Sequence, residues 1–557
     1  MVDNEEKQSE TKIEDKTTTE SDVPESPPVA SAQQKESIKP AEEQPPAAKI
    51  TPKKSLESRL YTVVSTNDES LGLFLILVIL SFITRFMLIW HPAECVFDEV
   101  HFGKFSNSHI KNEFYFDIHP PLGKLMLGFW TRILAPEYTG DFPFKDIGDK
   151  FGDPPKAPFI LMRSLPAFFN AWMAPLTYGI ARKLGCSLPI SFFAGLLVVF
   201  DVALNLQSRL ILIDSFLIFF ITLAVFLSSC AYNYASYENT FRPGYFGWLF
   251  LAGAAAGCAA SVKWTALAVL VGILLHHGLT VLYRLFWKKK GRSYVKIFFD
   301  GAARGIILLV APFMVYMLVQ YWHFSNLTKA GPGDGFMSLE FRAALEGSLQ
   351  PEEYDGPAAN FRQMSWELTK VMYRINAGML EPHPWMSPWY SWPFTKRGVS
   401  YATLENKPNP EGGAELHGRI YLMGNPAVWW GTTGGLALFI LCALPILMFQ
   451  IPLRPRSKWL LSQGFALFVQ YGLNLLPYMT IARSTFLYHY FPALLFAILI
   501  TSITLEFLMF KPWMRTLAVV LLSIPVIYLW WYFAPFLYGF PIPKDISDKR
   551  IWFESWH

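Results

Sequence analysis

Runs of about 20 mostly apolar residues recur along this chain, and no other feature restricts its fold as strongly. A bilayer core of about 30 Å requires about 20 such residues in a spanning helix. The composition agrees, because 52% of the 557 residues are hydrophobic and only 17% are charged. Soluble domains carry roughly 25% charged residues. The sequence therefore predicts an all-α polytopic membrane protein.

We predict about eleven transmembrane helices on this length criterion. Their approximate ranges are 71–90, 160–182, 188–206, 211–232, 245–262, 264–286, 301–322, 428–450, 459–480, 486–508 and 515–535. With this number of spans, the clusters of Lys and Arg between helices fall on one side of the membrane, which the positive-inside rule identifies as cytosolic. The N-terminus is then cytosolic and the C-terminus lumenal. The sequon Asn326-Leu327-Thr328 falls on the lumenal side, so Asn326 is a candidate glycosylation site.

The same pattern divides the chain into regions. Residues 1–58 contain no aromatic side chain and predict a disordered cytosolic tail. A transmembrane region at 59–322 follows and includes a first long lumenal loop at 91–159. A second lumenal loop at 323–427 precedes a transmembrane region at 428–535 and a lumenal tail at 536–557. Because both long loops lie on the lumenal side, we expect the chemistry there.

Several classes of function are disfavoured. Net charge is only +4 and the basic residues form short clusters, so no basic face for nucleic acid is expected. The five cysteines form no CxxC pair, which argues against a zinc cluster or a disulfide framework. The two halves of the chain show no corresponding broken helices, the pattern expected of many secondary transporters.

Two polar motifs follow the first predicted span. Asp98 and Glu99 are adjacent carboxylates at the lumenal membrane surface, where a lowered dielectric favours a general base. A solvated pair at the start of a helix is the other reading. His119 precedes Pro120-Pro121, and it either transfers a proton or marks the start of a helix.

Charged residues also lie inside or at the ends of the apolar runs. Each costs about 2.5–3.5 kcal/mol at the centre of a spanning helix, so each needs a cavity, a partner or a ligand. These residues are Arg163, Arg209, Asp214, Lys263 and Arg483. Asp214 could pair with Arg209, whereas the other three cations have no partner nearby in the sequence. An anionic lipid headgroup is their natural ligand.

Five motifs occur in an order that resembles the protein O-mannosyltransferase family. They are Phe97-Asp98-Glu99-Val100-His101-Phe102-Gly103, His119-Pro120-Pro121-Leu122-Gly123-Lys124, Gly331-Pro332-Gly333-Asp334 through Leu345-Glu346-Gly347, Trp392-Pro393-Phe394 through Arg397-Gly398-Val399, and Tyr421-Leu422-Met423-Gly424-Asn425-Pro426 through Trp429-Trp430. The resemblance covers roughly residues 70–535 and implies a glycosyltransferase of the GT-C type.

The resemblance implies an enzyme of the endoplasmic reticulum membrane. It would move mannose from dolichyl phosphate mannose to Ser or Thr of secretory proteins in the lumen, with inversion. Asp98 would be the catalytic base with Glu99 beside it, and Arg163 would hold the donor phosphate. Lys263 and Arg209 would add positive charge there, while His119, Asp214, Arg397 and Arg483 would support the site. A monophosphate donor needs no metal, and the lumenal loops lack a DxD motif, so no obligatory cofactor or metal is expected.

One departure from the family pattern leaves alternatives open. Most members carry a β-trefoil MIR domain after the Leu345-Glu346-Gly347 motif, whereas roughly 75 residues remain here before the next transmembrane region, too few for a trefoil. One alternative is a GT-C transferase that uses a polyprenyl-phosphate sugar with a lipid or other acceptor. A non-catalytic membrane chaperone or a transporter is the other. The resemblance also implies a homodimer or a heterodimer with a family member.

Overall fold

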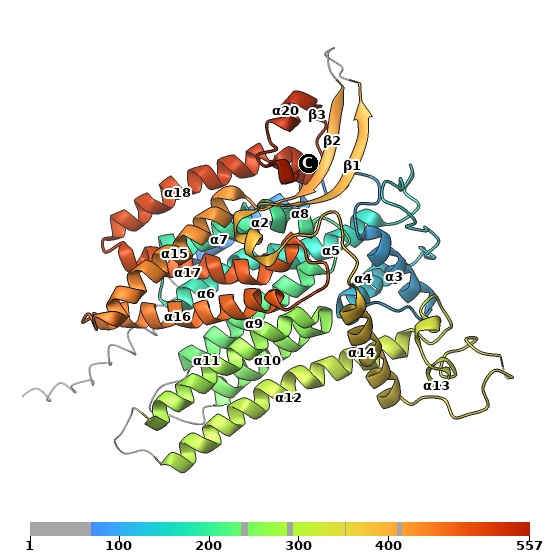
Figure 1. Ribbon diagram of the computed structural model, residues 1–557, viewed down its shortest axis with the longest axis horizontal. Coiled ribbons are helices and arrows are strands. Elements are labelled where there is room, and N and C mark those ends of the chain that lie inside the picture. Colours follow the sequence, from blue (N-terminus) through green and yellow to red (C-terminus); the bar gives the residue numbers. More distant parts are fainter. Residues whose placement is uncertain (1–67, 235–242, 287–292, 351, 409–414, 557) are drawn as a thin grey trace, which may run out of the picture. The chain divides into compact units, whose positions relative to one another are not determined.

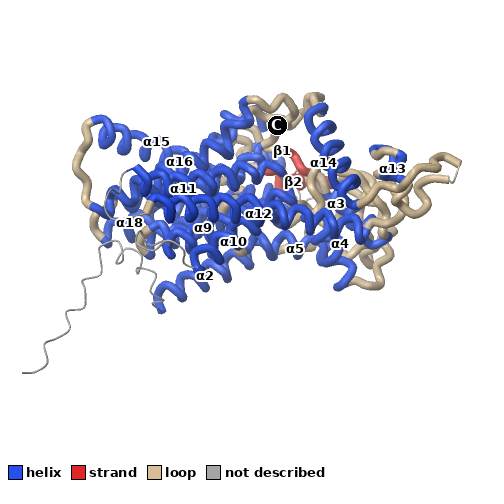
Figure 2. Tube along the Cα trace, turned by 90° about the horizontal axis from the view of Figure 1, so that it is seen from below, coloured by secondary structure: helices blue, strands red, loops and turns tan. Residues whose placement is uncertain are grey.

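The computed structural model describes residues 68–234, 243–286, 293–350, 352–408 and 415–556, and the predicted tail at 1–58 lies outside them. Helices dominate the described residues (Figures 1 and 2). The longer helices are α2 (Asp68–Phe86), α3 (Glu99–Lys111), α4 (Leu122–Leu134), α5 (Phe159–Ala171), α6 (Met173–Leu184), α7 (Leu188–Val199), α9 (Asp214–Tyr234), α10 (Pro243–Val262), α11 (Leu267–Phe286), α12 (Tyr294–Asn326), α14 (Phe361–Gly378), α15 (Pro426–Met448), α16 (Pro455–Leu475), α17 (Phe491–Leu508) and α18 (Pro512–Tyr532).

Each predicted span coincides with a helix or a pair of helices, but their regularity differs. In the described part of the chain, seven helices are long and apolar enough to cross a membrane: α9, α10, α11, α12, α15, α17 and α18. A further candidate is the pair α7 and α8 (Val202–Ser208), which is bent by 55°. The other three predicted spans correspond to the shorter α2, the interrupted pair α5 and α6, and α16. Four of the predicted spans are therefore shorter, broken or less apolar than expected.

The hydrophobic core lies where α7, α17 and their neighbours pack together. All but a few residues of α17 are buried, which fits its apolar character around the whole helix. Helix α17 packs against α15 and α16, and α10 packs against α9 and α12. Figure 1 shows α9, α10, α11 and α12 side by side in green, and the contacts agree. This packing fixes the helix ends that carry polar side chains.

The two long loops fold together around a second core. Helices α3 and α4 come from the first loop, and α13 (Leu339–Arg342) and α14 come from the second. Phe114 and Tyr115 pack in this core with residues of the second loop, among them Phe341. Gly331 permits the close approach, because a Cβ there would lie 2.2 Å from the Phe114 carbonyl oxygen. The glycine-rich motif at 331–334 therefore joins the loops.

A small antiparallel sheet was not among the expected elements. Strand β1 (Val399–Lys407) pairs with β2 (Leu416–Leu422), which pairs with the short β3 (Ile542–Pro543). Val399 lies opposite Leu422 and Ser400 opposite Tyr421. The sheet places Tyr401, which is buried, in the same core cluster as the main helices. The chain between the Leu345-Glu346-Gly347 motif and this sheet forms α14 and the 3₁₀ helix η3 (Trp389–Phe394).

The predicted sequon asparagine ends the longest described helix. Asn326 is the last residue of α12 and is half-buried. Its Nδ2 donates a hydrogen bond to the Trp322 carbonyl at 2.9 Å. The next residue, Leu327, is fully buried. Glycosylation at Asn326 stays a prediction.

Candidate active site

Asp98 lies in the short connection between α2 and α3, directly before the first residue of α3. Phe97 precedes it with φ of 53°, in the left-handed region, and its ring stacks on Tyr401 with centroids 3.9 Å apart. The Asp98 carboxylate is half-buried and accepts no hydrogen bond from any residue that the structure describes. Its position is therefore fixed through the backbone and Phe97, while its oxygens remain available.

The electrostatic surroundings of Asp98 suit a proton acceptor. Burial raises its pKa from about 3.8 to about 7; the positive charge of Lys263 opposes this shift, and the negative charges of Asp214 and Asp117 reinforce it. A carboxylate with a pKa near neutral pH is both ionised often enough and basic enough to take a proton from a hydroxyl group.

Glu99 has a different environment from its neighbour. Its side chain is fully buried and pairs with the fully buried Arg163, with Nε to Oε1 at 2.7 Å and Nη2 to Oε2 at 2.8 Å. The same carboxylate accepts hydrogen bonds from the backbone N–H groups of Val96 and Ile211, each at 2.9 Å. Glu99 thus joins the first loop to α5 and to the connection before α9.

Arg163 has different partners from the phosphate expected from the sequence. Besides its two bonds to Glu99, its Nη atoms donate to the backbone carbonyls of Ile89, Pro92 and Glu94. A guanidinium has five N–H groups, and these contacts use all of them. In this arrangement Arg163 has no donor left for a phosphate, and it holds the loop that carries Asp98.

Arg209 is also occupied by backbone carbonyls. It donates to the Leu88 carbonyl at 2.5 Å and to the Leu537 carbonyl at 3.3 Å, and its guanidinium lies 4.3 Å from the centre of the Tyr538 ring. Its Nε has no partner among the described residues. The side chain connects the ends of α2 and α8 to the short helix α19 (Ala534–Tyr538).

Asp214 pairs with Lys263, and not with Arg209 as its position in the sequence allowed. The Lys263 Nζ lies 2.8 Å from Asp214 Oδ1, and both side chains are almost fully buried. Gln207 Nε2 donates to Asp214 Oδ2 at 3.0 Å, and the Tyr401 hydroxyl donates to Gln207 Oε1. The Lys263 ammonium also lies 5.5 Å from the centre of the Tyr488 ring. The pair thereby connects the starts of α9 and α11 with β1.

His119 faces several cations. Lys124 Nζ donates to the Asp117 carboxylate and to the His119 backbone carbonyl. Burial, followed by the positive charges of Lys263, Lys124 and Arg483, holds the pKa of His119 well below 6.5. The ring is therefore neutral at neutral pH. No described residue forms a hydrogen bond with it.

Arg483 keeps part of its guanidinium free. One Nη donates to the Asn376 side-chain oxygen, and Asn376 Nδ2 donates to the Ile118 carbonyl at 2.6 Å. The Arg483 Nε has no partner within the described ranges. Its charge acts on His119 and on Tyr488, which places it in the same group as Lys263. Arg483 is thus the cation of this group with N–H capacity to spare.

Arg397 lies just after a loop rich in aromatic side chains, residues 384–394, called the aromatic loop below. Its Nη2 donates to the Pro384 carbonyl at 2.7 Å, and its guanidinium lies 5.8 Å from the Trp385 ring centre. These contacts hold the loop that precedes β1. Among the described residues, these contacts of Arg397 do not extend to Asp98 or Lys263.

The structure adds residues that the motifs did not indicate. Gln207, Asn376, Tyr401 and Tyr488 border the group formed by Asp98, Lys263 and Arg483. Gln207 and Asn376 are amides in apolar or amphipathic helices, which is the sequence signal that was available. Among the described residues, no three His, Cys, Asp or Glu side chains gather as a metal site.

Curated relatives of this chain are named as mannosyltransferases. Dolichyl-phosphate-mannose-protein mannosyltransferase 4 of Schizosaccharomyces pombe is 31% identical over 345 residues, 60% of this chain and 42% of the relative. The Saccharomyces cerevisiae enzyme of the same name is 32% identical over 55% of this chain and 39% of the length of that enzyme. Protein O-mannosyltransferase 1 of Drosophila melanogaster is 33% identical over 49% of this chain and 30% of the relative. The chain thus matches less than half the length of these relatives.

A solved structure has the same fold. It is the S. cerevisiae protein O-mannosyltransferase Pmt1-Pmt2 complex bound to the sugar donor, and one chain of it matches with a TM-score of 0.79 at 21% identity. The match covers 90% of this chain and 94% of that chain. This likeness confirms the expected GT-C type of fold.

Two family models complete the comparison. The model for dolichyl-phosphate-mannose-protein mannosyltransferase matches residues 75–328. The model for the C-terminal four-helix transmembrane region of protein O-mannosyltransferase matches residues 361–556. Together they include every candidate site residue discussed above, and the chain belongs to the protein O-mannosyltransferase family.

Proposed function

We propose that this protein transfers mannose from dolichyl phosphate mannose to Ser or Thr hydroxyl groups of secretory proteins. The observation that carries the proposal is the isolated Asp98 carboxylate, whose pKa is raised to about 7 and on which the positive charge of Lys263 acts. Lys263 and Arg483 both act on His119 of the same group. Family membership supports the donor and the reaction type. A site that combines a base with cations matches a hydroxyl acceptor and a phosphate leaving group.

Asp98 acts as the general base in this proposal. The acceptor hydroxyl attacks the anomeric carbon from the face opposite the phosphate, and its proton passes to Asp98. The bond between that carbon and the phosphate oxygen breaks, and dolichyl phosphate leaves with the electron pair. A single displacement inverts the anomeric centre. A positioned base of this kind typically contributes about 10²–10⁴-fold to the rate.

Lys263 and Arg483 hold the donor phosphate. The Lys263 ammonium has three N–H donors, and its ion pair with Asp214 uses one of them. The other donors can bind the phosphate. Arg483 has an Nε without a partner among the described residues. Arg163 acts as a positioning residue, because all of its N–H groups are directed to Glu99 and to backbone carbonyls. Arg209 is assigned the same role, because both of its Nη atoms donate to backbone carbonyls. The neutral His119 ring is available to donate or accept one hydrogen bond at the substrate.

The polyprenyl chain of the donor requires apolar surface near the phosphate. A cavity of about 500 Å³ lies between α2, α4, α5 and α12. Its walls are almost wholly apolar, with Phe129, Trp130 and Phe168 among them, and Ser164 at its edge follows Arg163 in the chain. We assign the chain of the donor to this cavity.

The proposed location and orientation in the membrane rest on the sequence pattern and on family membership. The protein is placed in the endoplasmic reticulum membrane, with its N-terminus cytosolic and its C-terminus and both long loops lumenal. The regions 1–58, 59–322, 323–427, 428–535 and 536–557 then serve as tail, first membrane region, lumenal loop, second membrane region and lumenal tail. The similar yeast protein forms a complex of two family members. We propose a homodimer or such a heterodimer here.

The test is a transfer assay with the purified full chain. Labelled dolichyl phosphate mannose and a Ser/Thr-rich peptide are incubated with the wild type, with Asp98→Asn, and with Asp141→Asn, an exposed carboxylate of the same loop. We expect transfer by the wild type and by Asp141→Asn, and a loss of about 10²–10⁴-fold in Asp98→Asn. Equal transfer by all three proteins would refute the role of Asp98. In a parallel reaction with a lipid acceptor, transfer to the lipid without transfer to the peptide would support the alternative GT-C reaction.

A further inference from the structure

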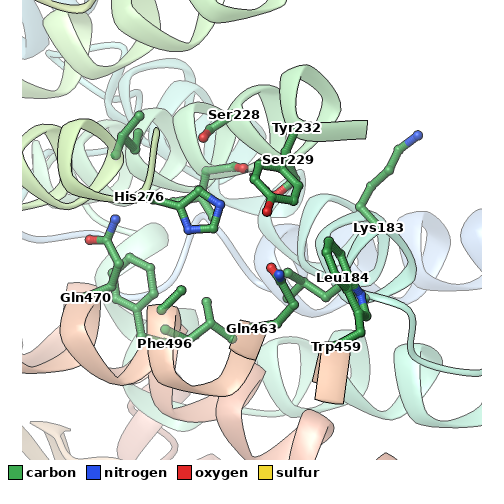
Figure 3. A pocket seen from close by; sticks show the side chains of 14 residues that line it. Lys183, Leu184, Ser228, Ser229, Tyr232, His276, Trp459, Gln463, Gln470 and Phe496 are labelled. Carbon is green, nitrogen blue, oxygen red and sulfur yellow. Dashed lines mark hydrogen bonds between the residues drawn. The ribbon is translucent and has the colours of Figure 1, made fainter. Parts of the chain in front are cut away.

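A second pocket lies away from the Asp98 group, and the proposed reaction does not use it. Its wall is mostly apolar but includes several polar side chains. Side chains of α6, α9, α11, α16 and α17 line it (Figure 3). Asp214 begins α9, whereas the lining residue Ser229 lies fifteen residues later, about 22 Å along the helix. The pocket encloses about 50 Å³. That volume holds about three water-sized groups, which is a fragment of a ligand and not a whole lipid.

The pocket contains polar groups that the protein does not satisfy. Gln470 is only 7% exposed, and its Oε1 accepts no hydrogen bond from the described residues. Gly272 makes room for this amide, because a Cβ there would lie 2.1 Å from the Gln470 Cδ. A buried acceptor of this kind requires a donor, which a bound hydroxyl group supplies.

Two further side chains extend into the same space. Figure 3 shows the His276 ring and the Gln463 amide entering the pocket from opposite sides. The His276 ring contacts Tyr232 edge to face, with centroids 4.8 Å apart, and neither His276 nor Gln463 forms a hydrogen bond with a described residue. These groups offer donors and acceptors together, which matches a ligand with several hydroxyl groups.

A cation and an aromatic wall complete the pocket. Lys183 lies in the last turn of α6 and has no ion pair with a described residue. Trp459 Nε1 donates to the Leu184 carbonyl at 3.0 Å, so that its ring is fixed beside the pocket. The remaining walls are largely apolar, with Ile273, Leu467 and Phe496. A lysine at the end of a spanning segment attracts lipid phosphate.

We propose that this pocket takes up hydroxyl groups from the headgroup of an anionic phospholipid, while the rest of the lipid stays outside it. Figure 3 shows the Lys183 side chain directed away from the other lining residues, so its ammonium pairs with the phosphate outside the enclosed space. One hydroxyl donates to Gln470 Oε1, and others bond with Gln463 and His276. The acyl chains remain outside, against the apolar surface of the helices. The ligand would connect α6, α11 and α16 at the end of these helices remote from Asp98.

The test uses the purified full chain in detergent and measures its thermal unfolding. Phosphatidylinositol is the probe, phosphatidylcholine is the comparison, and free inositol phosphate distinguishes a lipid from a soluble phosphate ester. We expect a saturable rise in Tm with phosphatidylinositol and none with phosphatidylcholine. In Lys183→Met, the phosphatidylinositol concentration that gives half of the maximal rise in Tm should increase about fivefold. In Gln470→Leu, most of the rise in Tm with phosphatidylinositol should be lost.

A matched control is available beside the pocket. Lys458 precedes Trp459, is exposed, and does not line the pocket. Lys458→Met should respond to phosphatidylinositol as the wild type does. Equal effects of both phospholipids, or an unchanged response in both Lys183→Met and Gln470→Leu, would overturn the proposal. A rise of Tm with free inositol phosphate that depends on Lys183 would support the site and identify a soluble ester as its ligand.

Discussion

Asp98 and Glu99 are adjacent in the sequence, yet their surroundings give them different roles. The Glu99 carboxylate accepts two bonds from Arg163 and two from backbone N–H groups. The Asp98 carboxylate accepts none from the described residues. A carboxylate saturated with donors is a poor base, whereas an isolated one with a raised pKa is a good one. Burial and hydrogen bonding are thus the reason why we propose a supporting role for Glu99 and a chemical role for Asp98.

Replacement of Glu99 tests the supporting role. In Glu99→Gln the buried Arg163 guanidinium loses its counter-charge, and we expect the free energy of unfolding to fall by about 3–5 kcal/mol. The measurement is thermal unfolding in detergent. Glu137→Gln, at an exposed position of the same loop, serves as the control and should leave the stability unchanged. Equal stability of the two variants would contradict a supporting role.

Replacement of Arg483 tests the phosphate assignment. Arg483→Gln removes a charged donor from the group around His119, and we expect KM for dolichyl phosphate mannose to rise about tenfold or more. KM for the acceptor peptide should stay the same. Arg397→Gln is the control, because Arg397 contacts Pro384 and Trp385 instead. A rise in the acceptor KM with no change for the donor would exclude a phosphate ligand.

The motifs predict candidate site residues at this scale, but not which residues pair. Asp98, His119 and Lys263 were all expected from the sequence. The partner of Lys263 is Asp214, 49 positions away, and the ion pair forms only because α9 and α10 pack together. Hydrophobic patterns predict helices, but they contain no information on which helix ends meet. Arg163 was therefore assigned to a phosphate, although its partner is Glu99.

At the scale of elements, the break between α7 and α8 shows how a polar residue interrupts an apolar run. The sequence predicted one span over 188–206, yet the two helices meet at 55°. Asp201 caps α8 by accepting a bond from the Leu204 N–H at 2.8 Å, and it also accepts one from Trp429 Nε1 at 2.7 Å. One aspartate changes the mean hydropathy of an apolar run very little. The sequence therefore predicts an unbroken span where the structure has two helices.

Asp201 should therefore be necessary for this bend. Asp201→Ala leaves the Leu204 N–H and the Trp429 indole N–H buried without acceptors, and we expect a loss of about 1–3 kcal/mol for each. Asp201→Asn retains an acceptor oxygen and should lose less. Chemical denaturation in detergent measures both. An Ala variant as stable as the Asn variant would show that the cap does not stabilise the bend.

The small sheet was missed for a different reason. Val399 and Tyr401 alternate as buried residues in β1, which is the period of a strand, but the stretch is short and follows the aromatic loop. Its partner strand begins nine residues after β1 ends, and β3 comes from the far end of the chain. Pairings across such distances depend on the tertiary fold. The prediction of helices succeeded because each long apolar run is a local signal.

On the scale of the whole molecule, the distribution of Lys and Arg between the apolar helices predicts a membrane topology. A glycosylation sequon inserted at Glu352-Glu353 lies in the second long loop and should be modified in the endoplasmic reticulum. The same sequon inserted in the basic cluster Lys288-Lys289-Lys290 should remain unmodified. Gel mobility before and after glycosidase treatment measures both. Modification of the second insertion alone would reverse the proposed orientation.

The pH dependence of mannose transfer shows whether Asp98 is the general base. Because burial raises the pKa of Asp98 to about 7 and only the ionised form accepts a proton, the rate should rise as pH increases and level off above about 7. The measurement is single-turnover transfer at saturating donor, for the wild type and Asp98→Asn. We predict a break near pH 7 in the wild type, and a rate about 10²–10⁴-fold lower without this break in the variant. The same break in both proteins would contradict Asp98 as the base.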